Sequence, residues 1–394
     1  MTCSHHAVPF RMVGKNIWFG LSLRDKKKWD KCNKCKSNVP VIILRHKDVY
    51  CKECFLSGAA HKFKAFIGKN HLVKKNDFVL VCFRSGHSSV SLLHMLRSAL
   101  DLQTPKKLKL RPIVIYIAKA TCEPQFLKEI EDVVCSFNFP LYFISFNQYI
   151  SNGQELDKVL FANFRQMLEN YPQINSFKRT NNPTATQTLE RIYEQQLLTE
   201  VAKHLNCSIV FVPDISLNVA TNLLTSISLG RGAYLPLDTG ICDTRDPQIT
   251  IVRPLRHFDD KELAFYNVYN KLKLVVSPNE IKKFNNTSVQ DLIDTFVSNL
   301  QLNYPATITT VVRTGDKLAL DKTVLKSKAC NLCKAPLLNN TSEELNSATA
   351  TDFSRWISAQ LQIFKKDESF NEFEIKQREL YCYACSKIIE FVEK

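Results

Sequence analysis

The sequence contains no run of about 18 or more uncharged apolar residues, which argues against a membrane-spanning helix. It also begins without the charged-then-apolar pattern of a secretory signal, so we expect an intracellular protein. Thiols stay reduced in such a compartment. The 14 cysteines are therefore expected to be mostly free thiols, and those at regular spacing are more consistent with metal ligands than with disulfides.

Acidic residues are scarce in the segment 1–75, where four of them stand against seventeen Lys and Arg, a net charge of +13. The rest of the chain carries only +2 of the total of +15. This charge density is typical of a segment that binds a polyanion such as nucleic acid, because each neutralised phosphate releases counterions. A solvated, solubilising surface is the alternative reading.

Two cysteine pairs lie close together near the start of the chain. Cys32 and Cys35 are separated from Cys51 and Cys54 by the segment 36–50, which has the apolar core of a short hairpin. A hairpin would bring the pairs together, and four thiolates at this spacing suit a tetrahedral zinc ion. We expect a closed structural zinc site, which leaves no open position for catalysis.

Two further pairs lie near the end of the chain. Cys330 and Cys333 are separated from Cys382 and Cys385 by the segment 334–381, which includes the polar stretch "LLNNTSEELNSATATD". We favour one shared zinc site for these four cysteines. Two separate dithiols are the alternative, because the connecting segment is long.

From residue 77 onward, short apolar runs alternate with segments of helical periodicity. This alternation predicts an α/β fold with a parallel sheet and helices on both faces. Residues 150–183 are expected to form a polar loop. We expect strands at 77–83, 112–118, 141–146, 208–212, 248–254 and 307–313, and helices at 88–101, 123–138, 184–204, 216–229, 259–273 and 288–301.

A phosphate-cradle pattern follows the first of these strands. The loop "RSGHSS" links strand to helix, and such loops bind anions through backbone amides and the helix N-terminus. Its candidate nucleotide-binding residues are Ser85, Gly86, Ser88 and Ser89. His87, however, stands where a second glycine would allow close approach to phosphate, and the loop holds no acid for a metal. We assign His87 no catalytic role, since no acid or nucleophile lies beside it.

Basic residues beside these motifs are candidates for RNA contact. The segment "HKFKAFIGKN" places Lys62, Lys64 and Lys69 beside an apolar helical face, and Arg84 begins the loop. We expect these four cations to bind RNA or another polyanion. The alternative for the lysine segment is a linker helix packed through its phenylalanines.

The order of these motifs resembles the cytoplasmic tRNA 2-thiolation protein 2 family of the PP-loop ATP pyrophosphatase superfamily. The resemblance covers roughly residues 32–386 and implies a PP-loop, adenine nucleotide alpha hydrolase-like fold. It rests on the stretches "CNKCKSNVPVIILRHKDVYCKECF", "HKFKAFIGKN", "VLVCFRSGHSSVSLLHML", "ITIVRPLRHFDDKELAFYN", "CNLCKAPL" and "YCYACS".

The sequence departs from the active members of that superfamily at three places. Their loop reads Ser-Gly-Gly-x-Asp-Ser, whereas residues 85–90 here read "SGHSSV". Their second nucleotide motif, Gly-His-Asn-x-x-Asp-Asp, appears here only as "PDISLNVAT". Their sulfur-handling cysteines have no counterpart, because no cysteine lies between Cys135 and Cys207 and Cys242 has no nearby pair. The resemblance therefore implies a subunit that is not catalytic alone.

The resemblance further implies a role in 2-thiolation of the wobble uridine, as 5-methoxycarbonylmethyl-2-thiouridine, in cytoplasmic tRNAs for Lys, Glu and Gln. The chain would act in the cytoplasm as a heterodimer with a catalytic PP-loop thiolase, which binds ATP. Sulfur would come from a thiocarboxylated ubiquitin-related modifier of the protein urmylation pathway. Two alternatives are an autonomous ATP-dependent tRNA sulfurtransferase and a zinc-ribbon nucleic-acid binder unrelated to thiolation.

These features predict three regions. Residues 1–75 would form a basic region with a zinc-ribbon module and a linker helix. Residues 76–315 would form the PP-loop-like α/β domain, and residues 316–394 a second cysteine module that also holds zinc.

Overall fold

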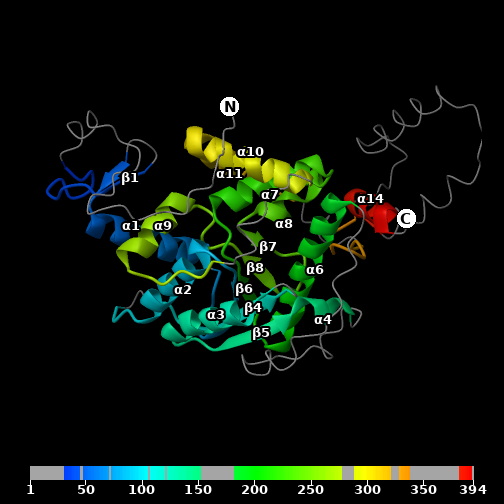
Figure 1. Cartoon of the computed structure of the whole chain (residues 1–394), viewed down its shortest axis with the longest axis horizontal. Helices are drawn as coiled ribbons and strands as arrows, with labels where there is room; N and C mark the ends of the chain where they lie inside the picture. Colours follow the sequence, from blue (N-terminus) through cyan, green and yellow to red (C-terminus); the bar gives the residue numbers. More distant parts are fainter. Residues whose placement is uncertain are drawn as a thin grey trace, which may run out of the picture. The chain divides into compact units, whose positions relative to one another are not determined.

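The computed structural model describes residues 31–44, 48–70, 72–104, 107–119, 122–151, 182–276, 288–320, 328–337 and 381–392 (Figure 1). The chain divides into two compact units, Met1–Lys62 and Phe63–Lys394. Among the described residues, no helix is long and apolar enough to cross a membrane. Most of the polar loop predicted at 150–183 lies outside these residues.

The first unit contains the predicted hairpin strands. β1 (Ile42–Leu44) pairs antiparallel with β2 (Asp48–Tyr50), with Ile42 opposite Tyr50. Ile42 and Val49 are buried, so the apolar core of the cysteine-rich segment is formed as expected. Helix α1 (Lys52–Lys69) follows directly.

A six-stranded sheet forms the centre of the second unit. Its strand order is β5-β4-β3-β6-β8-β7, and every neighbouring pair is parallel except β7 with β8. The sheet therefore confirms the predicted parallel α/β architecture, while the short antiparallel edge strand was not predicted. The strands are β3 (Asp77–Phe83), β4 (Leu110–Ala118), β5 (Leu141–Ser145), β6 (Ile209–Phe211), β7 (Cys242–Asp243) and β8 (Thr250–Val252).

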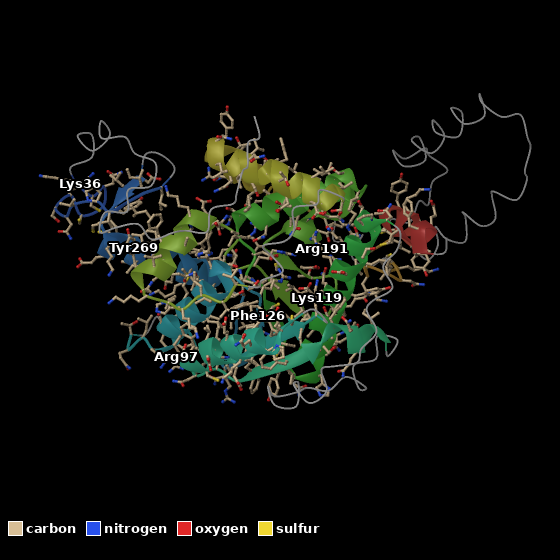
Figure 2. The ribbon with its side chains drawn as sticks, in the orientation of Figure 1. Lys36, Arg97, Lys119, Phe126, Arg191 and Tyr269 are labelled. Atoms are coloured by element: carbon tan, nitrogen blue, oxygen red, sulfur yellow. The ribbon has the colours of Figure 1, made fainter. Side chains whose placement is uncertain are left out.

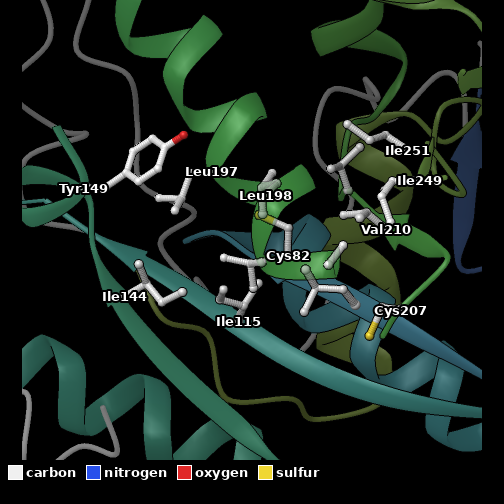
Figure 3. Close-up of a cluster of buried hydrophobic side chains, with 14 of the residues drawn as sticks. Cys82, Ile115, Ile144, Tyr149, Leu197, Leu198, Cys207, Val210, Ile249 and Ile251 are labelled. Atoms are coloured by element: carbon white, nitrogen blue, oxygen red, sulfur yellow. The ribbon is translucent and has the colours of Figure 1, made fainter. Parts of the chain in front are cut away.

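Helices cover both faces of this sheet. They are α2 (His87–Leu100), α3 (Pro124–Ser136), α4 (Phe146–Ser151), α6 (Pro183–His204), α7 (Ser216–Ser228), the short α8 (Leu235–Thr239) and α9 (Asp260–Tyr269). On one face, Leu197 and Leu198 of α6 pack over Cys82 and Ile115 of the central strands (Figure 3). Because successive strand residues point to opposite sides, Val81 faces the other side of the sheet.

One predicted strand is wrong. Residues 307–313 form part of helix α11 (Pro305–Gly315), which follows α10 (Val289–Asn303). Thr and Val favour strands, but Pro305 suits the first turn of a helix, and Ile308 and Val312 lie one turn apart. Both side chains are buried in a cluster with Val219 of α7. Tertiary packing therefore outweighs the local strand preference.

The end of the described chain contains a small cysteine-rich region. Ala329 forms an isolated antiparallel bridge with Pro336, and helix α14 (Tyr383–Val392) follows after a gap in the described residues. The polar connection between the two cysteine pairs lies in that gap.

Candidate functional site

The four N-terminal cysteines gather into one cluster. Cys32 and Cys35 lie on a turn before β1, Cys51 follows β2, and Cys54 lies in the first turn of α1. Their sulfur atoms all lie within 4.8 Å of one another, with 3.9 Å between Cys35 and Cys51. Chain folding therefore brings both pairs to one point, as their spacing predicted.

The four C-terminal cysteines form a second cluster, in which every residue is buried. Cys330 and Cys333 lie on a turn, while Cys382 and Cys385 lie at the start of α14. Their sulfurs are also within 4.8 Å of one another, with 3.7 Å between Cys333 and Cys382. The two distant pairs thus share one site despite the long connection between them.

The dimensions of both clusters suit a tetrahedral metal ion. A zinc–sulfur bond of about 2.3 Å places tetrahedral sulfurs about 3.8 Å apart, which matches the distances above. The first pair of each cluster lies on the same kind of turn. The residue after the second cysteine, Lys36 or Lys334, has a φ of 59° or 57°, and its amide donates to the carbonyl of the first cysteine at 2.9 Å.

Backbone amides also point at the sulfurs, as expected for thiolates. The Lys34 amide donates to the Cys32 sulfur at 3.4 Å, and the Cys382 amide donates to the Cys330 sulfur at 3.3 Å. Hydrogen bonds from the Ser37 side chain and the Asn38 backbone lower the pKa of Cys35 to about 6. These donors favour the charged sulfur that a metal requires.

The strand–loop–helix at residues 83–90 keeps the shape of a phosphate cradle. Gly86 has φ 100° and ψ −176° and precedes the first residue of α2. Its amide, however, donates to the Val275 carbonyl at 2.8 Å, and the Arg84 amide donates to the Ser89 hydroxyl at 2.8 Å. Two donors that could face a phosphate are therefore bound within the chain.

Helix α9 holds the same loop from the other side. The Asn267 amide group donates to the His87 carbonyl at 3.0 Å and accepts from the Ser91 hydroxyl at 2.9 Å. Asn267 is fully buried, so this contact is part of the packed core. Ser85 and Ser88 remain half-buried, whereas Ser89 is buried.

Charged residues follow the carboxyl ends of the parallel strands, where a nucleotide would bind in this class of sheet. Arg84 follows β3, and its guanidinium contacts Asp214 at 2.8 Å and Glu194 at 3.1 Å. Asp214 follows β6 and also lies 3.5 Å from Arg253, the residue after β8. Lys119 follows β4 and contacts Glu190 of α6 at 2.9 Å. This edge of the sheet is therefore occupied by internal ion pairs.

The segment "PDISLNVAT", which was compared above with the second nucleotide motif, also forms hydrogen bonds within the chain. At the start of α7, the Ser216 amide donates to the Phe258 carbonyl at 3.0 Å, and its hydroxyl donates to Asp259 at 3.0 Å. The Ile215 amide donates to the Asn218 side chain at 3.0 Å. The amides of Ser216 and Ile215 are thus satisfied by the protein itself.

The residues predicted to contact tRNA lie in two settings. Lys62 and Lys64 are half-buried on α1, and Lys69 is exposed at its end. Arg84 is committed to Asp214 and Glu194, which weighs against a free phosphate contact there. On the apolar side of α1, Phe63 is buried, so the linker-helix packing and the basic face coexist.

A buried ionic cluster, which sequence reasoning missed, connects the C-terminal cysteines to the α/β domain. Asp238 accepts from Arg231 at 2.9 Å and from Arg245 at 2.6 Å. Arg231 lies 3.9 Å from the Cys385 sulfur, and Arg245 donates to the Cys333 carbonyl at 3.0 Å. No periodic pattern marks these residues. The charged residues after the strands, by contrast, could have been noticed, because Arg84, Lys119 and Arg253 each end an apolar run.

Comparison with known proteins gives a consistent picture. The sequence model of the family described as cytoplasmic tRNA 2-thiolation protein 2 matches residues 288–387. The protein of that name from Drosophila mojavensis is 33% identical, over 91% of this chain and 89% of that protein. The one from Xenopus tropicalis is 28% identical, over 84% of this chain and 77% of that protein.

Among solved structures, the U34-tRNA thiolase NcsA from Methanococcus maripaludis, which was determined with its [4Fe-4S] cluster, superposes with a TM-score of 0.57. It is 17% identical, and the match covers 77% of this chain and 95% of that one. At this identity the likeness shows a shared fold, in agreement with the predicted PP-loop-like α/β architecture.

Proposed function

Because this chain belongs to the cytoplasmic tRNA 2-thiolation protein 2 family, we propose that it supports 2-thiolation of the wobble uridine in cytoplasmic tRNAs. The substrates would be the tRNAs for Lys, Glu and Gln. The relatives' name supports the reaction and the compartment, and the fold that the chain shares with a tRNA thiolase is consistent with both.

The chain is proposed to act without turning over ATP itself. The main support for this proposal is that groups at the carboxyl ends of the parallel strands, where a nucleotide would bind, are bonded to other parts of the chain. The Gly86 amide donates to the Val275 carbonyl, and Arg84 is paired with Asp214 and Glu194. A bound phosphate would have to displace these contacts. The residues Ser85, Gly86, Ser88 and Ser89 would then serve the packing of the loop.

A catalytic PP-loop thiolase would form a heterodimer with this chain and bind ATP, taking sulfur from a thiocarboxylated ubiquitin-related modifier. The basic region at residues 1–75, with Lys62, Lys64 and Lys69, would bind the tRNA phosphates. The α/β domain at 76–315 and the cysteine module at 316–394 would complete the subunit. Both cysteine clusters fit zinc, which would hold their turns and helix ends together.

Mass analysis of wobble uridine tests this function. Cells that lack the protein should lose 2-thiouridine from the three tRNAs, and the wild-type chain should restore it. Normal 2-thiouridine in the deletion strain would refute the proposed role.

Loop variants separate the subunit role from autonomous catalysis. Ser85→Ala and Ser88→Ala should restore thiolation as well as wild type, because neither hydroxyl is assigned a step. Loss of thiolation in folded Ser88→Ala protein, or pyrophosphate release by the purified chain alone with ATP and tRNA, would favour an autonomous enzyme.

A further inference from the structure

A cavity of about 640 Å³ lies in the second unit, and none of its lining residues belongs to the degenerate loop. Helices α6 and α7 form its walls, together with the segment around Arg231 and Arg245 and the turn that carries Cys333. The volume is typical of a small-molecule site. Cys333 belongs to the second cysteine cluster, but no role proposed above uses the space of the cavity itself.

One face of α6 supplies a row of polar side chains to the cavity. Gln187, Arg191 and Gln195 lie at intervals of four residues, and Thr188 lies between them on the same side. Residues three or four apart share one helix face, so these groups converge on a single space. Figure 2 labels Arg191 at this helix.

Arg191 forms no direct ion pair in the part of the chain that the structure describes, although the carboxylates of Asp238 and Asp214 are close enough to raise its pKa against the lowering effect of burial. No carboxylate lies within ion-pair distance of it, and no hydrogen bond of its guanidinium is formed there. The other arginines of the cavity are neutralised, since Arg231 and Arg245 contact Asp238 at 2.9 and 2.6 Å. Lys203 likewise contacts Asp246 at 2.5 Å.

One carboxylate that lines the cavity, Glu200, takes part in none of these ion pairs. Glu200 lies nine residues beyond Arg191 on α6, which places it about 13 Å along the helix axis. Burial raises the pKa of Glu200. The space beside Arg191 is therefore suited to an anion.

Unsatisfied oxygens around the same cavity point independently to a ligand. The Thr225 hydroxyl and the side-chain carbonyl oxygens of Gln196 and Gln290 are buried and make no hydrogen bond among the described residues. Thr225 is only 4% exposed. Buried polar atoms of native proteins nearly always have a partner, so these three mark groups that a bound molecule would satisfy.

We propose that this cavity binds a phosphate ester of about nucleoside-monophosphate size, with its phosphate on Arg191. The planar guanidinium forms paired hydrogen bonds with phosphate oxygens. The amide oxygens of Gln196 and Gln290 accept hydrogen bonds, so the rest of the ligand carries hydroxyl or amine donors. This site is independent of the thiolation function and of the degenerate loop.

The proposal is tested by calorimetric titration of the purified full-length chain with 5′-AMP, ribose 5-phosphate, inorganic phosphate and adenosine. The phosphate esters should bind saturably, and adenosine at least about tenfold more weakly. Loss of charge-assisted hydrogen bonds in Arg191→Gln should weaken the binding of 5′-AMP about ten- to hundredfold. Arg191→Lys keeps the positive charge but cannot form the paired hydrogen bonds. Its affinity for 5′-AMP should therefore lie between those of the wild type and Arg191→Gln.

Two control variants locate the effect. Arg97→Gln removes an exposed arginine of α2 and should leave binding unchanged, while Ser88→Ala should also leave it unchanged if the loop is not the site. Equal binding of adenosine and 5′-AMP, or full affinity in folded Arg191→Gln protein, would overturn the proposal. So would Arg191-dependent binding of tRNA alone, which would make the cavity an RNA contact.

Discussion

Replacing Asp238 by asparagine should destabilise the second unit strongly. The carboxylate is 5% exposed and accepts from Arg231 at 2.9 and 3.3 Å and from Arg245 at 2.6 Å. Asparagine keeps the shape of the side chain but removes its charge. Arg245 would keep its ion pair with Asp243 at 3.0 Å, whereas Arg231 would have no carboxylate partner among the described residues.

The expected magnitude follows from this geometry. Removing one partner of a buried ion pair costs about 3–5 kcal/mol, because the other charge stays desolvated. Asp101→Asn is a matched control, since Asp101 forms an exposed pair with Arg97 at 2.9 Å. An exposed helical pair of this kind contributes about 0.3–0.5 kcal/mol. The two asparagine variants should therefore differ roughly tenfold in their effect.

The pKa of Asp238 sets how the stability difference between the wild type and Asp238→Asn depends on pH. Burial alone would raise the pKa of Asp238, but Arg231 and Arg245 lower it below its ordinary value of 3.8. A carboxyl whose folded-state pKa is depressed stabilises the fold fully above its unfolded pKa. That stabilisation is lost as the pH falls through the folded pKa. The gap between wild type and Asp238→Asn should therefore stay constant from pH 8 to about pH 5.

Urea unfolding of the full-length chain, followed by circular dichroism, measures the effect. Metal release to a coloured chelator is a second readout, because Arg231 and Arg245 contact the Cys385 sulfur and the Cys333 carbonyl. Asp238→Asn should release metal faster than wild type, and Asp101→Asn should not. A loss below about 1 kcal/mol for Asp238→Asn would refute the argument that this carboxylate is a buried counter-ion.

Three other predictions concern the metal sites, a glycine and a buried thiol. Elemental analysis should find two zinc ions per chain and one in Cys330→Ser, and hydrogen exchange should show that the variant loses protection in α14; iron with labile sulfide would contradict the zinc assignment. Gly86→Ala should cost about 1–3 kcal/mol in thermal unfolding, because φ is 100°, whereas Gly58→Ala inside α1 should stabilise by about 0.5–1 kcal/mol. An added Cβ meets no atom within 4 Å at either glycine, so equal effects would refute the backbone explanation. Burial raises the pKa of Cys82 to about 12, so iodoacetamide should leave it unmodified in native protein at pH 8; rapid alkylation seen by mass spectrometry would contradict this.

The central sheet was predictable because its strands carry their own signal. The run 77–83 is almost wholly apolar and is predicted as a buried strand, and β3 has those bounds. The prediction for 307–313 failed for the converse reason. Its threonines and valines favour a strand locally, whereas Pro305 in the first turn and the burial of Ile308 and Val312 against α7 favour the helix.

The candidate site also combines features that the sequence predicts with features that only the folded chain shows. Cysteine spacing of the Cys-x-x-Cys kind predicts metal ligands directly, since each pair can turn both sulfurs toward one ion. The pairing of Cys330 and Cys333 with Cys382 and Cys385 needed the fold, because the whole segment 334–381 separates them. The ion pair between Arg84 and Asp214 spans 130 residues and left no local pattern.

The sequence by itself determined the α/β architecture, the four Cys-x-x-Cys pairs and the departure of residues 85–90 from the loop pattern Ser-Gly-Gly-x-Asp-Ser, because each of these signals lies in residues close together along the chain. Tertiary structure alone decided which contacts form at the carboxyl edge of the parallel strands: the Gly86 amide donates to the Val275 carbonyl, and Arg84 forms ion pairs with Asp214 and Glu194. It also decided that Arg191 and Thr225 line one cavity, in which the Arg191 guanidinium forms no ion pair and the Thr225 hydroxyl no hydrogen bond among the described residues. Such contacts join residues far apart in sequence, and only the folded chain brings them within bonding distance.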